Sequence, residues 1–358
     1  MIDGDAVPGG HRVQLDQTAR FLCELGVEAE VSFASEMAVE NYDLVHGFGL
    51  PPRWIRRCRQ AGIPVVLSPI YWARDYTTGQ DKAYSNRRDA ARNLWNRIHQ
   101  GAGLARAALG NRSSEACQER NEALTNLRVI YEMADLLLPN SQLEADAIVA
   151  DLEVTAPFHV VPNSVDVVRF ELPQTEMSRD YVLCAGRIEP HKNQLGLIRA
   201  WDKTLPPLKI VGKTHPHHAA YYERCQRAAA ARNIEILPGV AHDELPALYH
   251  GARVHVLPTW FETTGLVSLE AALCGCNIVT TSRGFAREYF EDLAWYCDPA
   301  RPQTIRDAVK GAWETPFRAA LRERILERYS WQKTARRTLE GYQMALRPAA
   351  KVSVVSNS

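Results

Sequence analysis

The chain has 358 residues, and its 42 lysines and arginines balance its 42 aspartates and glutamates. A net charge of zero gives no bulk attraction to nucleic acid, so we expect no nucleic-acid partner. No stretch is apolar and long enough to span a bilayer, and the first residues lack the pattern of a signal peptide. The eight scattered cysteines favour buried free thiols and a cytoplasmic protein, and the length suits two domains.

The first half of the chain alternates short apolar segments with helical patterns. Strands are predicted over residues 28–34, 42–48, 63–69, 134–140 and 157–163. Such alternation is typical of an α/β domain with a parallel sheet. Ahead of the first helix, which should begin near Val13, Gly9 and Gly10 allow the backbone to approach a phosphate closely.

Three side chains at the ends of these strands are candidates for lining a cleft. His46 ends the segment 42–48, and Tyr71 and Trp72 follow the segment 63–69. An aromatic ring beside a cleft can stack on a sugar ring. The alternative is a packed histidine at a strand end and two aromatic residues in the core.

A basic stretch follows, with eight lysines and arginines against three aspartates between Arg74 and Arg112. Residues 82–112 have a basic amphipathic pattern that suits weak peripheral contact with the inner face of a membrane. The favoured alternative is a solvated helical face.

The polar segment PQTEMSRD, residues 173–180, reads as a linker between domains. We therefore predict one Rossmann-like domain over residues 1–172 and a second Rossmann-like domain over residues 173–335. A crossover helix over residues 336–350 and a tail over residues 351–358 should complete the chain.

The second domain opens with an apolar strand that leads into two cations. The run YVLCA ends at Gly186, and Arg187 and Lys192 lie on the turn before a helix that Asn193 can cap. Open α/β sheets bind ligands at the carboxyl ends of their strands. Arginine offers a planar fork and lysine a point charge, which suits the two phosphates of a diphosphate. Two solvated surface cations are the alternative.

About seventy residues later, the segment FETTGLVSLEAA again follows a predicted strand and leads into a helix, and it carries two carboxylates. A strand over residues 254–257 should lead to a helix over residues 265–273, with Thr263 or Thr264 as N-cap. Free N–H groups at the helix start can meet phosphate oxygens. Glu262 and Glu270 can then accept hydrogen bonds from sugar and ribose hydroxyls, unless they are only a helix-start acid and a solvated helix residue.

The combination of GRIEPHKN with PTWFETTGLVSLEAALCGCNIV resembles the C-terminal domain of retaining family-4 glycosyltransferases, which belong to glycosyl transferases group 1. The resemblance implies the GT-B fold, in which two Rossmann-like parallel-sheet domains face each other across a cleft and the last helix crosses back. It implies that Arg187 and Lys192 hold the donor diphosphate, Glu262 the donor sugar and Glu270 the ribose. The remaining donor-side residues would be Gly9, Gly10, Gly186, Val240, Thr263, Thr264, Gly265 and Leu266.

The implied activity is retaining, metal-independent transfer of a hexose, with Glu262, Arg187 and Lys192 as the catalytic residues. The donor would be a nucleotide sugar, UDP-glucose or another UDP-hexose as the best guess, and it would bind to the second domain. The acceptor would be a saccharide or lipid-linked glycan, bound by the domain over residues 1–172, with His46, Tyr71 and Trp72 as candidate contacts. We expect no cofactor and no metal. The alternatives are a catalytically silent GT-B homologue acting as a scaffold and a nucleotide-sugar 2-epimerase. The resemblance weakens at MIDGDAV, where family members begin with a strand, and at SPIYW, where many carry a His–Asp pair.

Overall fold

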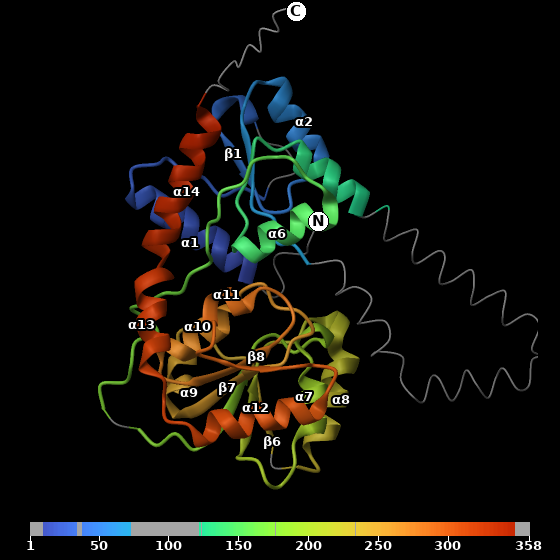
Figure 1. The fold of residues 1–358 in the computed structure, drawn as a ribbon, viewed down its shortest axis with the longest axis vertical. Coiled ribbons are helices and arrows are strands. Elements are labelled where there is room, and N and C mark those ends of the chain that lie inside the picture. The colour runs from blue at the N-terminus through green and yellow to red at the C-terminus, as the bar shows by residue number, and fades with distance from the viewer. Residues whose placement is uncertain are drawn as a thin grey trace, which may run out of the picture.

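The computed structural model describes residues 10–33, 38–72, 122, 124–175, 177–232 and 234–347. Two parallel sheets lie in two domains, one above the other in Figure 1. This arrangement is the predicted GT-B architecture. Within the described ranges, no helix combines the length and apolar character needed to cross a membrane.

The first domain is built on a sheet with the order β1-β2-β3. Its strands are β1 (Val45–Gly47), β2 (Val65–Leu67) and β3 (Leu136–Leu137), and its helices are α1 (Gly10–Glu24), α2 (Pro52–Gln60) and α6 (Gln142–Leu152), with the short η1 (Val39–Asn41). Residues 124–132 are also helical. Helix α1 begins at Gly10, three residues before the predicted start.

Two of the strands predicted for this domain are wrong or reduced. Residues 28–33 form no strand: none of their side chains is buried and Phe33 remains 63% exposed, so the apolar side chains of this alternating segment do not pack on the core. In the segment 157–163, only Phe158 pairs with the sheet, as a single bridge to Leu137.

The second domain has a six-stranded sheet with the order β6-β5-β4-β7-β8-β9. Its strands are β4 (Tyr181–Ala185), β5 (Leu208–Val211), β6 (Ile234–Leu237), β7 (Ala252–Leu257), β8 (Asn277–Thr281) and β9 (Trp295–Cys297). After β4, the strands β5 and β6 are added on one side of the sheet, and after β7, the strands β8 and β9 are added on the other. The boundary between β4 and β7 is therefore the topological switch point, where open α/β sheets bind their ligands.

Helices cover both faces of this sheet. One core cluster involves α9 (Leu245–Gly251), α10 (Leu266–Leu273), α11 (Ala286–Phe290) and α13 (Ala319–Arg328), and the other involves α7 (Gln194–Ala200), α8 (Ala219–Ala229) and α12 (Pro302–Glu314). Two short helical turns, η2 (Pro190–Lys192) and η3 (Pro216–His218), follow β4 and β5. Burial on both faces explains why β4 is continuously apolar.

The last helix, α14 (Trp331–Leu346), returns to the first domain, as Figure 1 shows. It begins five residues before the predicted 336 and packs against α1, β2 and β3. Its Tyr342 hydroxyl lies 2.8 Å from His46 Nδ1, and Gly341 allows close approach to Leu138. The crossover predicted for a GT-B protein is therefore present.

A polar seam also joins the two domains through α11. The carboxylate of Glu288 accepts hydrogen bonds from the backbone N–H groups of Gln142 and Leu143, both at 2.9 Å. These donors belong to the first turn of α6, and the partial positive charge at a helix start favours the negative charge of Glu288 there. The seam fixes the first turn of α6 against the second domain.

Gly212 provides a test of how the switch-point loops pack. A Cβ at this position would lie 1.8 Å from the carbonyl oxygen of Gly186, which is rigid backbone. We expect Gly212→Ala to lower the free energy of unfolding by about 1–3 kcal/mol, since overpacking must displace the chain. Chemical denaturation measures this. Gly62→Asn is the control, because Gly62 has a positive φ but open space around it, and asparagine tolerates that conformation. Equal stability of Gly212→Ala and wild type would contradict the close approach.

Candidate active site

A cavity of about 420 Å³ lies at the carboxyl ends of β4 and β7, with walls from both domains. Most residues predicted from the sequence line it: Gly10, Trp72, Gly186, Arg187, Lys192, Val240, Glu262, Thr263, Thr264, Gly265, Leu266 and Glu270. Lining residues that the sequence analysis missed include Gln14, Asn140, Asn163, His191, Lys213 and His242. Gly9, residues 82–112 and the tail 351–358 lie outside the described residues.

Lys192 and Glu262 form an ion pair on the wall of this cavity. The Lys192 Nζ and Glu262 Oε2 atoms are 2.9 Å apart, and the side chains are only 17% and 10% exposed. Burial, the largest single influence, acts to raise the pKa of Glu262, but the charge of Lys192, the interaction with His191 and the hydrogen bonds from Lys192 and the Gly265 backbone together lower it. The carboxylate is therefore ionised at neutral pH. Its loop is joined to that of Lys192 by a hydrogen bond from Trp260 N to His191 O, 3.0 Å long.

Arg187 lies beside this pair on the turn after β4. Its guanidinium donates to Glu189 Oε1 at 3.1 Å and its side chain remains 40% exposed. The turn is formed by Gly186 at φ 146° and is held by a hydrogen bond from Gln194 Nε2 to Arg187 O. Because part of its fork is accessible at the cavity, Arg187 can bind an anionic oxygen there.

Helix α10 presents its N-terminus to the same space. The predicted N-cap by Thr263 or Thr264 is wrong: the helix begins after Gly265, which has φ 79°, and has no side-chain cap. The Thr264 hydroxyl instead accepts a hydrogen bond from Asn163 Nδ2 at 3.2 Å. The first amides of a helix lack intrahelical partners, and Leu266 and Val267 line the cavity, so this helix start can receive an anion.

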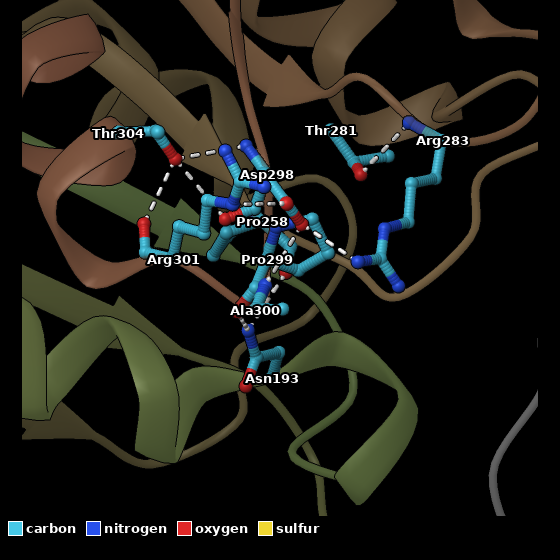
Figure 2. A network of polar contacts seen from close by, with 9 residues as sticks. All are labelled: Asn193, Pro258, Thr281, Arg283, Asp298, Pro299, Ala300, Arg301 and Thr304. Atoms are coloured by element: carbon cyan, nitrogen blue, oxygen red, sulfur yellow. Dashed lines mark hydrogen bonds and ion pairs between the residues drawn. The ribbon is translucent and has the colours of Figure 1, made fainter. Parts of the chain in front are cut away.

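Figure 2 shows a network of polar contacts that joins the loops near the Lys192–Glu262 ion pair. Asn193 was predicted to cap α7, but its Nδ2 atom bridges the carbonyl oxygens of Pro258 and Pro299, at 3.2 and 3.1 Å. It adopts φ 56° at the helix start and makes no side-chain cap. Arg283 donates to Asp298 Oδ1 at 2.8 Å in the same network. The loops after β4, β7 and β9 are thus tied together, which limits the movement of Lys192 and Glu262.

The second predicted carboxylate, Glu270, is engaged by two side chains. His242 Nε2 lies 3.0 Å from Glu270 Oε1, and the Tyr249 hydroxyl donates to Oε2 at 3.1 Å. The hydrogen bond with Glu270, followed by its charge, raises the pKa of His242. Glu270 and His242 line the cavity beside Gly239 and Val240. A carboxylate held in this way retains lone pairs for a hydroxyl ligand.

The acceptor-side candidates have three different environments. Trp72 is 45% exposed and stacks on His191 of the second domain, with ring centroids 4.7 Å apart at 5°. Burial, with a further contribution from Lys192, lowers the pKa of His191 to about 4, so this ring is neutral. Tyr71 is 1% exposed and donates to Asp151, and His46 is held between Tyr342 and Ser68. Only Trp72 of these candidates lines the cavity.

In the parts of the chain that the structure describes, no group of three or more histidine, cysteine, aspartate or glutamate side chains is arranged to hold a metal ion.

Comparison with known proteins agrees with this geometry. Residues 170–329 match the family described as glycosyl transferases group 1. The chain is 27% identical to O-antigen chain mannosyltransferase B of Escherichia coli over 46% of each chain, and 27% identical to glycogen synthase of Mycobacterium tuberculosis over 57% of this chain and 53% of the relative. The chain thus spans about half the length of these relatives. D-inositol 3-phosphate glycosyltransferase of Pseudarthrobacter chlorophenolicus is 26% identical over 96% of this chain and 91% of the relative.

Solved structures share the fold. Sucrose-phosphate synthase from Thermosynechococcus elongatus superposes with a TM-score of 0.64 at 16% identity, over 95% of this chain and 96% of the other. Anabaena HepE, solved in complex with UDP and glucose, gives a TM-score of 0.60 at 18% identity over 85% and 78%. The matched segment carries Arg187, Lys192, Glu262 and Glu270. The fold is therefore GT-B, and the second domain of this chain belongs to the glycosyl transferases group 1 family.

Proposed function

We propose that this protein is a retaining, metal-independent glycosyltransferase. It transfers a hexose from a nucleotide sugar to a saccharide or lipid-linked glycan acceptor. The observation that carries the proposal is the meeting of two cations, a helix start and two buried carboxylates in one cavity at the switch point. A nucleotide sugar needs all of these, because its diphosphate binds fixed positive charge and its two sugars bind acceptors of hydroxyl hydrogen bonds.

The proposed diphosphate site consists of Arg187, Lys192 and the start of α10. Cleavage of the sugar–phosphate bond leaves negative charge on the departing phosphate oxygen. Fixed cations and backbone amides in a buried cavity stabilise such charge more strongly than water does. Lys192 has Glu262 as its counter-charge, so a diphosphate would add to this arrangement without leaving the carboxylate unpaired.

A front-face path fits these residues. The acceptor hydroxyl attacks the anomeric carbon on the side from which the phosphate departs, and the leaving phosphate oxygen takes the hydroxyl proton. Glu262 would position the transferred sugar rather than attack it, because its carboxylate is held by Lys192. Catalysis then rests on orientation and on charge stabilisation.

Glu270 would bind the ribose of the donor, with His242 and Tyr249 fixing the carboxylate. UDP-glucose or another UDP-hexose is the proposed donor. The fold shared with HepE, which was solved with UDP and with UDP-glucose, supports this choice. Trp72, on the first-domain wall, is the proposed acceptor contact.

The two alternatives fit the cavity less well. An epimerase would need acid–base carboxylates from the first domain, whereas the described carboxylates of the cavity wall, Glu262 and Glu270, both come from the second. A silent scaffold would not require the buried Lys192–Glu262 pair to remain in an accessible cavity.

Donor binding is the first test of this proposal. UDP or a UDP-hexose at a hundredfold excess over its Kd should stabilise the wild type by about 2.7 kcal/mol, seen as a rise in the thermal midpoint. Lys192→Gln should remove most of this rise, because it removes a charge from the diphosphate site. Lys203→Gln is the control, since Lys203 carries the same charge on an exposed loop. A wild type that responds to no UDP, GDP, dTDP or ADP compound would exclude the proposed donor site.

Metal removal gives a second test. Transfer should proceed at an unchanged rate in excess EDTA, because Arg187 and Lys192 supply the positive charge that a divalent ion would otherwise provide. Radiolabelled sugar incorporation measures this rate. A loss of activity that Mg²⁺ or Mn²⁺ restores would refute the metal-independent part of the proposal.

The configuration of the product gives a third test. We expect an α-linked donor to give an α-linked product, because the acceptor approaches on the face that the phosphate leaves. The anomeric proton coupling in the NMR spectrum of the first-formed product distinguishes the two outcomes. A β-linked product would exclude the front-face path.

A further inference from the structure

Two asparagines of the cavity wall have no role in the site described so far. Asn140 follows β3 in the first domain, and Asn163 lies on the segment that leads to the second domain. They are 1% and 6% exposed, and both line the cavity. Asn140 Nδ2 and Asn163 Oδ1 are buried atoms without any hydrogen-bond partner. Such atoms cost free energy in an empty site and suit a ligand that supplies the missing hydrogen bonds.

Every other polar group of Asn140 is paired. Its backbone N–H donates to Glu144 Oε2 at 2.6 Å, its carbonyl accepts from the Tyr289 hydroxyl at 2.7 Å, and its Oδ1 accepts from Gln14 Nε2 at 2.9 Å. The backbone N–H of Asn163 donates to the Tyr289 hydroxyl at 2.9 Å, and its Nδ2 atom donates to the Thr264 hydroxyl. Asn140 and Asn163 are therefore both held by the hydroxyl group of Tyr289.

Exchanging the oxygen and nitrogen of either amide would move the unpaired atom without removing it. Asn163 would then accept from Thr264 and leave its nitrogen unpaired. Asn140 would place its nitrogen against the amide of Gln14. An amide atom without a partner thus remains at both positions under either assignment.

The position of the pair indicates which part of a ligand it meets. Asn163 is bonded to Thr264, which immediately precedes the Gly265 start of α10. Asn140 belongs to the opposite, first-domain wall. A sugar ring attached to a diphosphate at the α10 start would lie between these walls. Sugar hydroxyls both donate and accept, so they can satisfy an amide nitrogen and an amide oxygen together.

We propose that Asn140 and Asn163 recognise hydroxyl groups of the transferred sugar in the nucleotide-sugar donor. This inference rests on the proposed function and adds the residues that determine the specificity for the sugar. A site that hydrogen-bonds a hydroxyl discriminates strongly against a sugar that lacks it, because its own polar atoms would stay unpaired. Gln14 and Tyr289 act as positioning residues for the pair.

The test compares two ligands that differ only in the sugar. Isothermal titration calorimetry measures the Kd of UDP and of UDP-glucose, or of the matching pair for whichever nucleotide stabilises the wild type. Asn140→Ala and Asn163→Ala should each weaken binding of the nucleotide sugar about tenfold and change binding of the free nucleotide less than about twofold. Gln17→Ala is the matched control, because Gln17 also has a buried unpaired oxygen but does not line the cavity. It should leave both affinities unchanged.

Two outcomes would overturn the inference. Equal weakening of both ligands would show that the asparagines only maintain the shape of the site. Unchanged binding of the nucleotide sugar would assign the unpaired atoms to water or to the acceptor. If one alanine variant unfolds, the other carries the same test, since each unpaired atom is on a separate side chain. Failure of the wild type to bind any nucleotide would instead count against the proposed function.

Discussion

The ion pair between Lys192 and Glu262 is the interaction around which the site is organised. Its partners lie 70 residues apart in the chain and follow the two central strands, β4 and β7. Removing one member of a buried pair leaves an uncompensated charge, so both loops must keep their positions relative to each other. The Asn193 bridge, the bond from Trp260 to His191 and the close packing of Gly212 on Gly186 all serve that constraint. The proposed diphosphate site is thus built on loops that hold one another in place.

The second-domain half of this site could be predicted from the sequence because its chemistry is local. Arg187 and Lys192 follow a strand, Glu262 follows another, and parallel strands bring their carboxyl ends to one edge. The same reasoning failed for the cap of α10. Two threonines are good capping residues, but the left-handed Gly265 ends the loop, and Thr264 bonds to Asn163 instead. The sequence pattern does not show which of these two hydrogen bonds forms.

In the first-domain half, only Gly10 and Trp72 of the cavity wall were predicted. Gln14 and Asn140 are 126 residues apart and form one hydrogen bond, and no local motif marks either residue as part of a cavity. Tyr71 and Trp72 are adjacent aromatic residues in the sequence, yet Tyr71 is buried and Trp72 lies on the cavity wall. The backbone N–H of Tyr71 donates to the buried Glu144, and this hydrogen bond holds Tyr71 in the interior. Burial raises the pKa of Glu144 to about 8. Which of two adjacent aromatic residues is buried therefore depends on their tertiary contacts, which the local sequence does not show.

The return of α14 to the first domain has a consequence for how the protein is made. Its buried face, with Thr334, Ala335 and Thr338, completes packing that α1, β2 and β3 begin. The strands of the first domain are synthesised before the second domain, but this covering helix follows the whole second domain. Domains generally fold as units during synthesis, and exposed apolar surface and strand edges promote aggregation. The first domain must therefore wait, with part of its sheet uncovered, until the second domain has also been synthesised.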